Sequence, residues 1–289
     1  MGSIRLRMRQ TFSASSFDAN LPSEFVGRVH SIFSKAFNIK TEEDELISIV
    51  AAEKLNGPNR ILIKLPGDND FTTLEIKEGT RVVGTTQKIS IDNGNFLISL
   101  REAKKWSSKV EIEEKTLSSR VRDNLFGSFP QKDFSTKQER SSISQELRIR
   151  IQELIASIKE RDSAKISKNI KRLIGFGEGL TPSGDDFLVG LIASLYFLGN
   201  SKSQHLLKKI KRIINLEKEK TTFLSGKFLE YACQGRFPET ILDLIEAIFS
   251  ENGEGTEEAA RRCLDFGATS GRDTLLGVVE GLGLIVQDR

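Results

Sequence analysis

Apolar and polar residues alternate in short runs along the first third of the chain, and the runs are rich in β-branched residues. This period of two is typical of strands with one buried face. Turn residues separate the runs, and Asp92-Asn93-Gly94 between two of them predicts a hairpin. The pattern predicts a small antiparallel sheet or barrel. The expected strands are residues 60–65, 72–76, 81–86, 88–91 and 95–100.

From about Lys137 onward the apolar period changes to near 3.6, which is typical of helices with one buried face. Strands followed by helices, without alternation, favour an α+β fold over a Rossmann sheet. Residues 126–142 are rich in Ser, Gln and Lys, as is typical of a connection. We therefore expect a β-rich N-terminal domain over residues 1–125 and a helical domain over residues 137–289. The expected helices are residues 144–161, 163–174, 181–198, 201–219, 223–234, 238–250, 256–266 and 272–286.

Charge and composition exclude several classes of protein. The 43 basic and 40 acidic residues give a net charge of +3, too balanced to indicate a nucleic-acid partner. The longest apolar run, residues 187–199, is too short to span a bilayer, so no membrane partner is expected. Two cysteines without a signal peptide indicate a cytoplasmic protein. Two histidines cannot form a multi-histidine zinc site, and we assign no metal and no cofactor.

The most informative segment is a glycine-rich run, residues 175–186, that leads into a long apolar helix. Threonine is a good N-cap and proline suits the first helical turn, so we expect Thr181 to cap a helix that Gly199 ends. The glycines allow positive φ angles or a close approach of the backbone to a ligand. We therefore expect this run to line a pocket. Its glycines before the helix are Gly175, Gly177 and Gly179.

The charge of this helix start restricts its ligand. A carboxylate of Asp185 or Asp186 about 6 Å from a phosphate would cost on the order of 3 kcal/mol at an effective dielectric near 20. A bare phosphate is therefore disfavoured unless a cation joins it, and the run also lacks the lysine of a P-loop. A ligand with an acidic and an amide end fits better. Backbone N–H groups and the Ser183 hydroxyl would hold the acid, and an aspartate would accept the amide protons.

A second, shorter copy of the motif lies near the C-terminus, where residues 269–277 align with residues 182–190 without a gap. One interpretation is that Ser-Gly-x-Asp is simply a good helix start. The other is that the two starts converge on one cleft, and that Arg272, which stands where Asp185 stands in the first copy, receives an anion. The paired residues are Ser183 with Ser270, Gly184 with Gly271, and Asp186 with Asp273.

These arguments define a set of candidate site residues, without assigning a nucleophile. Thr221, Thr222 and Ser225 are expected mainly to cap a helix, and Cys233 to pack in the core. The candidate catalytic residues are Asp185, Asp186 and Asp273. The candidate ligand-binding residues are Gly175, Gly177, Gly179, Thr181, Ser183, Gly184, Ser270, Gly271 and Arg272.

The run Gly-x-Gly-x-Gly-Leu-Thr-Pro-Ser-Gly-Asp-Asp-Phe-Leu-x-Gly over residues 175–190 resembles the hallmark of AllH-type proteins. Weaker similarity, for example at residues 27–30, 57–58 and 232–235, extends over nearly the whole chain. The resemblance implies a subunit of oxamate carbamoyltransferase that works with AllF- and AllG-type companion subunits in anaerobic allantoin breakdown, a branch of purine catabolism.

That reaction implies a small anionic carbamoyl or ureido compound as the partner. In the degradative direction, oxalurate and phosphate would give oxamate and carbamoyl phosphate. The resemblance assigns no residue a catalytic role. The alternative is a noncatalytic metabolite-binding or scaffolding subunit of a multi-subunit complex.

Overall fold

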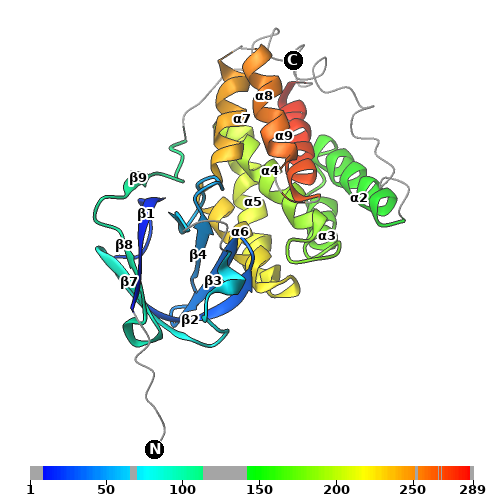
Figure 1. Ribbon diagram of the computed structural model, residues 1–289. Coiled ribbons are helices and arrows are strands. Elements are labelled where there is room, and N and C mark those ends of the chain that lie inside the picture. Colours follow the sequence, from blue (N-terminus) through cyan, green and yellow to red (C-terminus); the bar gives the residue numbers. More distant parts are fainter. Residues whose placement is uncertain are drawn as a thin grey trace, which may run out of the picture. The chain divides into compact units, whose positions relative to one another are not determined.

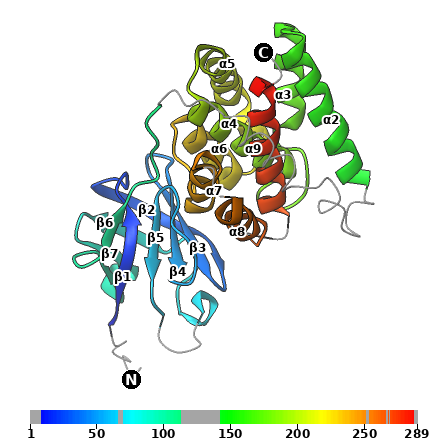
Figure 2. The ribbon, with the colours of Figure 1, turned by 90° about the horizontal axis from the view of Figure 1, so that it is seen from above.

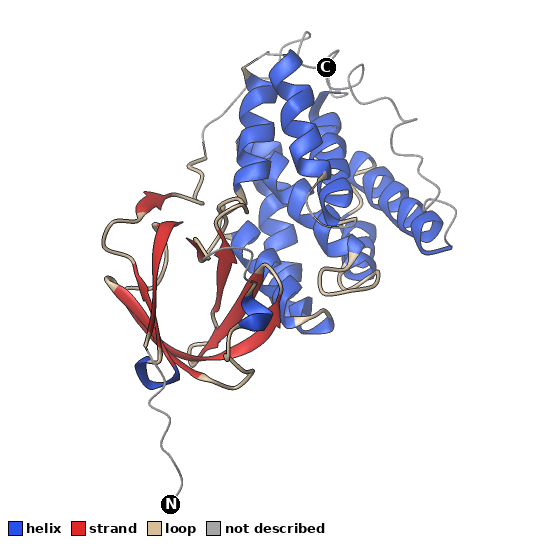
Figure 3. Ribbon diagram, viewed as in Figure 1, coloured by secondary structure: helices blue, strands red, loops and turns tan. Residues whose placement is uncertain are grey.

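The computed structural model describes residues 9–65, 70–112, 142–250, 253–265, 267 and 269–286. The chain forms two compact units, residues 1–108 and residues 109–289. Figures 1 and 3 show the strands in the first unit and the long helices in the second. This is the α+β arrangement that the hydrophobic pattern predicts, strands first and helices later. The expected connection over residues 126–142 lies, apart from Ser142, outside the described residues.

The first unit is a nine-stranded sheet in the order β5-β4-β3-β2-β6-β7-β8-β1-β9, and β5 also pairs with β1. That extra pairing closes the sheet into a barrel (Figures 1 and 2). Most neighbouring strands are antiparallel, as expected, but β1 runs parallel to β8 and β9, and β4 runs parallel to β5. The strands are β1 (Gln10–Asp18), β2 (Glu24–Phe33), β3 (Ala36–Thr41), β4 (Leu46–Ala51), β5 (Arg60–Ile63), β6 (Arg81–Thr85), β7 (Lys88–Ile91), β8 (Phe96–Ser99) and β9 (Lys104–Trp106).

The interior of the barrel is filled by alternate side chains of its strands, among them Phe37, Ile39 and Ile89. The four expected strands that match β5 to β8 are confirmed, and so is the hairpin at residues 92–94, which joins β7 to β8. The expected strand at residues 72–76 is wrong. A 3-10 turn occupies Phe71–Thr73 there, because the Asp70 carboxylate accepts hydrogen bonds from the N–H groups of the two following threonines.

The second unit is helical, and every expected helix is present within two or three residues of its predicted ends. Helix α4 is buried along almost its whole length and packs against α9, α5, α6 and α7 (Figures 1 and 2). Among the described helices none is long and apolar enough to cross a bilayer. The helices are α2 (Ser142–Lys159), α3 (Ser163–Leu173), α4 (Ser183–Leu198), α5 (Ser201–Glu217), α6 (Phe223–Cys233), α7 (Glu239–Phe249), α8 (Gly253–Leu264) and α9 (Ser270–Val286).

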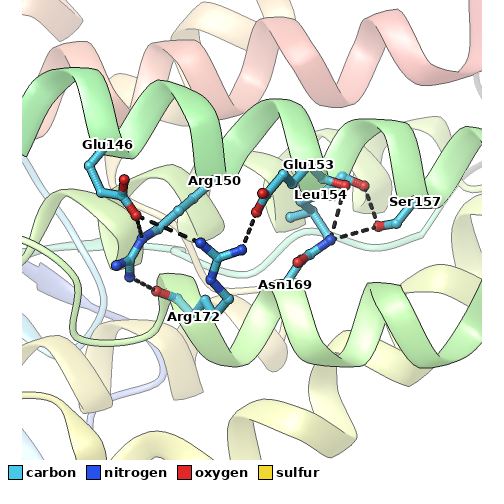
Figure 4. Close-up of polar contacts among 7 residues, drawn as sticks. All are labelled: Glu146, Arg150, Glu153, Leu154, Ser157, Asn169 and Arg172. Carbon is cyan, nitrogen blue, oxygen red and sulfur yellow. Dashed lines mark hydrogen bonds and ion pairs between the residues drawn. The ribbon is translucent and has the colours of Figure 1, made fainter.

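A polar seam joins α2 to α3 just before the glycine-rich run (Figure 4). Arg150 on α2 binds Glu146 at 2.8 Å and donates to the backbone carbonyl of Arg172 near the end of α3. The Arg150 guanidinium also lies 3.8 Å from the ring centre of Phe176, a residue of the glycine-rich run. Farther along, Asn169 donates to the carbonyl of Glu153 at 3.0 Å. The seam therefore fixes the end of α3, from which the glycine-rich run departs.

Candidate functional site

The two copies of the motif pack directly against each other as the starts of α4 and α9. A methyl group added at Gly190 would overlap the carbonyl oxygen of Thr274, and one added at Gly277 would overlap that of Phe187. Phe187 and Thr274 occupy the same place in the two copies, so the contact is reciprocal. Reciprocal contacts are those of two elements related by a twofold axis. The later glycines of the repeat thus let two helix backbones touch.

The polar residues of each helix start likewise lie beside those of the other copy. Burial raises the pKa of both Asp186 and Asp273, and a serine of the opposite copy acts against the rise, Ser270 at Asp186 and Ser183 at Asp273. Each serine therefore lies near the aspartate of the other copy. The structure thus brings these four candidate residues together at one place.

Thr181 joins this group instead of capping α4. Its hydroxyl lies 2.8 Å from the hydroxyl of Ser270, and Thr181 also acts against the rise that burial causes in the pKa of Asp186. Helix α4 begins at Ser183 after Pro182, with no side-chain cap, so the predicted role of Thr181 as N-cap is wrong. The hydroxyl instead contacts a residue 89 positions away in the sequence. The prediction that Gly199 ends the helix is confirmed by its left-handed φ of 58°.

Each aspartate of the pair keeps one buried oxygen without a hydrogen-bond donor among the described residues. These oxygens are Oδ2 of Asp186, a residue 8% exposed, and Oδ2 of Asp273, a residue 1% exposed. Burial raises the pKa of Asp186 to about 8, and the charge of Asp273 adds to the rise. Burial also raises the pKa of Asp273. An unpaired buried carboxylate is costly, so both groups are poised to take protons or a ligand that donates them.

Asp185, although next in sequence, has a different environment. It accepts hydrogen bonds from the backbone N–H of Gly175 at 2.9 Å and from the hydroxyls of Thr221 and Ser225. Burial raises its pKa, while these three donors favour the ionised form. Both of its oxygens are thereby occupied. This set of partners favours a structural role, in which Asp185 ties the glycine-rich run to the start of α6.

The glycines of the run are required for two different reasons, a positive φ angle and a close approach to another part of the backbone. Gly175 has a φ of 72° and approaches the carbonyl oxygen of Lys220, where a side chain would come within 2.5 Å. Gly177 has a φ of 124° and lies against the backbone nitrogen of Ser183. Gly179 has a φ of 88° and open space around it, so only its backbone angle requires glycine. Two of the three glycines therefore serve close packing within the protein.

The remaining glycines of the motif are also packed. Gly184 lies against the carbonyl oxygen of Leu173 at the end of α3, and its own N–H donates to the carbonyl of Phe176 at 2.8 Å. Gly271 is buried, and its carbonyl oxygen lies 3.5 Å from the sulfur of Cys263. That the run over residues 175–186 lines a pocket stays a prediction.

Three residues at the start of α6, which were expected mainly to cap that helix, also contact Asp185 or the glycine-rich run. Thr222 does cap α6, accepting from the N–H of Ser225 at 3.1 Å, and its hydroxyl also donates to the carbonyl of Leu180 in the glycine-rich run. Thr221 and Ser225 instead serve Asp185. A threonine pair and a serine at a helix start signal capping, but nothing in the sequence indicates which carboxylate they serve.

Arg272 supplies the only cation that contacts the aspartate pair within the described residues. Its side chain is 21% exposed, and Nη2 lies 3.4 Å from Oδ1 of Asp273. The thiols are poor alternatives for chemistry, since burial raises the pKa of both Cys233 and Cys263 to about 12. In the described part of the chain, His, Cys, Asp and Glu form no group of three suited to a metal ion. The arrangement offers two buried acceptors, two serine hydroxyls and one arginine.

Two known protein families match the chain. The family described as oxamate carbamoyltransferase subunit AllH matches residues 173–282, which hold both copies of the motif. The AllH family N-terminal domain matches residues 7–105, which hold the barrel. A search of the solved structures found no match. The two family matches cover most of the chain and confirm the resemblance. The chain therefore belongs to the AllH family, whose name denotes a subunit of oxamate carbamoyltransferase.

Proposed function

We propose that this chain binds a small carbamoylated anion of the oxalurate or oxamate type between the starts of α4 and α9, as a subunit of a carbamoyltransferase. The observation that carries the proposal is the pair of buried aspartates, Asp186 and Asp273, each with one oxygen that lacks a donor among the described residues. An amide NH₂ group has two protons to donate and can satisfy one oxygen of each aspartate.

The charges of the site determine where each end of such a ligand binds. The aspartates accept the N–H protons of the amide or ureido end, while Arg272 beside Asp273 binds the acidic end. Ser183 and Ser270 lie near the aspartates of the opposite copies and add two hydroxyl groups to the site. Catalysis then comes from orienting the carbamoyl group and stabilising its developing charge, with no covalent step on the protein.

Ligand binding is expected to release protons. Because the pKa of Asp186 is raised to about 8, its carboxyl holds a proton at neutral pH in the empty site. A ligand that donates N–H groups stabilises the ionised form, so binding lowers that pKa. Calorimetric titration of oxamate at pH 7 in two buffers of different ionisation enthalpy would detect the released proton.

The direct test is phosphate-dependent cleavage of oxalurate, a step of allantoin breakdown, by the purified chain alone and with AllF- and AllG-type companions. Activity with companions that is lost in Asp186→Ala and Arg272→Ala, but kept in Glu178→Gln, would support the proposal. Glu178 is the matched control because it is an exposed carboxylate of the same run. Full activity in Asp186→Ala would contradict it.

The same experiment distinguishes a catalytic subunit from a noncatalytic one. If the chain binds oxamate but the companions cleave oxalurate equally fast without it, the chain is a metabolite-binding or scaffolding subunit.

A further inference from the structure

The helical unit contains a cavity of about 470 Å³ that the aspartate pair does not use. Its wall comes mainly from α2, α3, α4, α5 and α9. Cavities of about 300–1,000 Å³ are the size that holds small organic ligands. An occupant lies largely against apolar surface, because five aliphatic side chains belong to the wall. They are Ile158, Ile166, Leu195, Leu206 and Leu284.

The cavity is separate from the aspartate pair. Leu195 in its wall follows Asp186 by nine residues on α4, which corresponds to about 13 Å along the helix. Leu284 likewise lies near the far end of α9 from Asp273. The cavity and the two helix starts therefore occupy opposite ends of the α4–α9 pair.

The basic residues of the wall already interact with other groups of the protein. Lys209 donates to the hydroxyl of Ser163. Burial raises the pKa of Glu280, and the charge of the nearby Lys159 acts against the rise. The other two basic residues of the wall have partners as well, and these are Arg161 and Lys202. In the described part of the wall, charge therefore does not call for an anionic ligand.

Ser203 is the polar residue of the wall that points to a ligand. It is 2% exposed, yet its hydroxyl has no hydrogen-bond partner among the described residues. Its backbone N–H donates to the side chain of Asn200, the N-cap of α5, at 2.9 Å, which fixes the residue at the helix start. Buried polar groups in native proteins nearly always have a partner. A neutral hydroxyl among aliphatic side chains is best satisfied by an uncharged ligand that carries an oxygen.

We propose that this cavity is a second ligand site, which binds an uncharged, mainly apolar small molecule with one oxygen. The oxygen forms a hydrogen bond with the Ser203 hydroxyl, and the apolar body lies against the leucines and isoleucines of the wall. Affinity then comes from buried apolar area and one hydrogen bond, without a contribution from net charge. The inference uses no residue of the aspartate pair and does not depend on carbamoyl chemistry there.

Three matched probes test the proposal by calorimetric titration of the full chain. p-Cresol, toluene and p-toluate share a methylphenyl body and differ in carrying a hydroxyl, no polar group or a carboxylate. We expect saturable binding of p-cresol. Toluene should bind roughly threefold to tenfold more weakly, which is the effect of one hydrogen bond. p-Toluate should bind more weakly than p-cresol by roughly tenfold or more, because a buried carboxylate without a partner is unfavourable.

Ser203→Ala identifies the hydrogen bond. In this variant the preference for p-cresol over toluene should disappear, while toluene binds as it does to the unaltered chain. The matched control is Ser194→Ala, which should keep the preference. Ser194 is a buried serine of α4 outside the cavity wall, and its hydroxyl donates to the carbonyl of Leu191 at 2.7 Å.

Leu206→Trp identifies the cavity, because the larger side chain of this half-buried wall residue fills it. The variant should lose binding of both p-cresol and toluene. Ser203→Ala keeps the proposal testable if Leu206→Trp does not fold, since it removes only a hydroxyl that has no partner among the described residues. The proposal is overturned by a lack of saturable p-cresol binding, by tighter binding of p-toluate than of p-cresol, or by an unchanged preference in Ser203→Ala. Undiminished binding to folded Leu206→Trp would also overturn it.

Discussion

Asp185 and Asp186 are adjacent in sequence but have different environments, because successive residues of a helix point about 100° apart. Asp185 faces the start of α6, where three donors occupy its oxygens. Asp186 faces α9 and keeps one oxygen without a donor from the described residues. Replacing each in turn should therefore separate a structural carboxylate from a ligand-binding one.

Asp186 should make the protein less stable as pH rises. Its pKa is raised to about 8 in the folded chain and is near 3.9 when unfolded. Between these values the folded state holds a proton that the unfolded state has lost, so the free energy of unfolding falls with rising pH. The decline approaches about 1.4 kcal/mol per pH unit and levels off above pH 8.

Urea unfolding between pH 5.5 and 8.5 measures this slope. Asp186→Asn should reduce the slope, since the amide does not titrate, and should leave the variant more stable than the unaltered chain at pH 8. Asp185, Asp273 and Glu280, whose pKa values burial also raises, contribute a slope of the same sign that the variant keeps. Carboxylates with lowered pKa, such as Glu217 and Glu230, act only in more acidic solution. An identical slope in the variant would mean that Asp186 is ionised in the folded protein at neutral pH.

Asp185→Ala should lower stability far more than Asp186→Ala. The change leaves the N–H of Gly175 and the hydroxyls of Thr221 and Ser225 without their acceptor. The Ser225 hydroxyl is buried and costs about 1–3 kcal/mol without an acceptor, whereas Gly175 and Thr221 are half-buried and within reach of water, so a loss of about 1–3 kcal/mol is expected. Thermal unfolding of the two alanine variants compares them directly. Equal losses of stability would indicate that Asp185 does not hold the glycine-rich run in place.

At the scale of elements, the α4–α9 contact depends on two glycines. Gly190→Ala and Gly277→Ala each push a methyl group into a carbonyl oxygen of the facing helix, which only separation of the helices relieves. Overpacking costs about 1–3 kcal/mol in ordinary cores, and backbone contact makes the upper end or more the expectation. Both variants should also weaken oxamate binding, because the aspartates move apart.

Gly253→Ala is the matched control for these variants. Gly253 begins helix α8, and nothing lies within 4 Å of the place where its side chain would be. Chemical denaturation should therefore find this variant as stable as the unaltered chain. If Gly190→Ala behaves like Gly253→Ala, the close packing of α4 on α9 is not needed for stability.

The polar seam between α2 and α3 also holds the glycine-rich run in place. Arg150→Ala removes the bonds to Glu146 and to the carbonyl of Arg172, and the contact with the Phe176 ring. A loss of about 1–3 kcal/mol is expected, whereas Gln152→Ala on the exposed face of α2 should change little. Arg150→Lys should not restore stability, because an ammonium cannot reproduce the planar guanidinium contacts. Urea midpoints of the three variants provide the measurement.

At the scale of the whole molecule, each unit has its own hydrophobic core. The barrel is closed by pairing within residues 10–106, including the β1–β5 pair that joins its ends. A fragment of residues 1–112 should therefore fold by itself. Circular dichroism should report strands, and urea should unfold it in one cooperative transition. A gradual, uncooperative loss of signal would show that the barrel needs the helical unit.

The sequence by itself determined the fold class, the order of the eight described helices, and the existence of a repeated helix start. These features are encoded locally, since periods of two and 3.6 record which face of each segment is buried. The in-register repeat of Ser183 with Ser270 and Asp186 with Asp273 was likewise visible without coordinates. No strand before Arg60 was predicted from the sequence. β4 is buried on both faces and lacks alternation, whereas β1 and β2 do alternate and were missed.

Only the tertiary structure decided what the polar residues do. Thr181 has the chemistry of an N-cap but bonds to Ser270, and Asp185 takes its partners from a helix start some 40 positions away. The cavity beside Ser203 is formed by five helices and has no signature in any of them. The physical reason is that helix periodicity depends on neighbours a few residues apart, whereas the pairing of buried polar groups depends on which segments the packed core brings together.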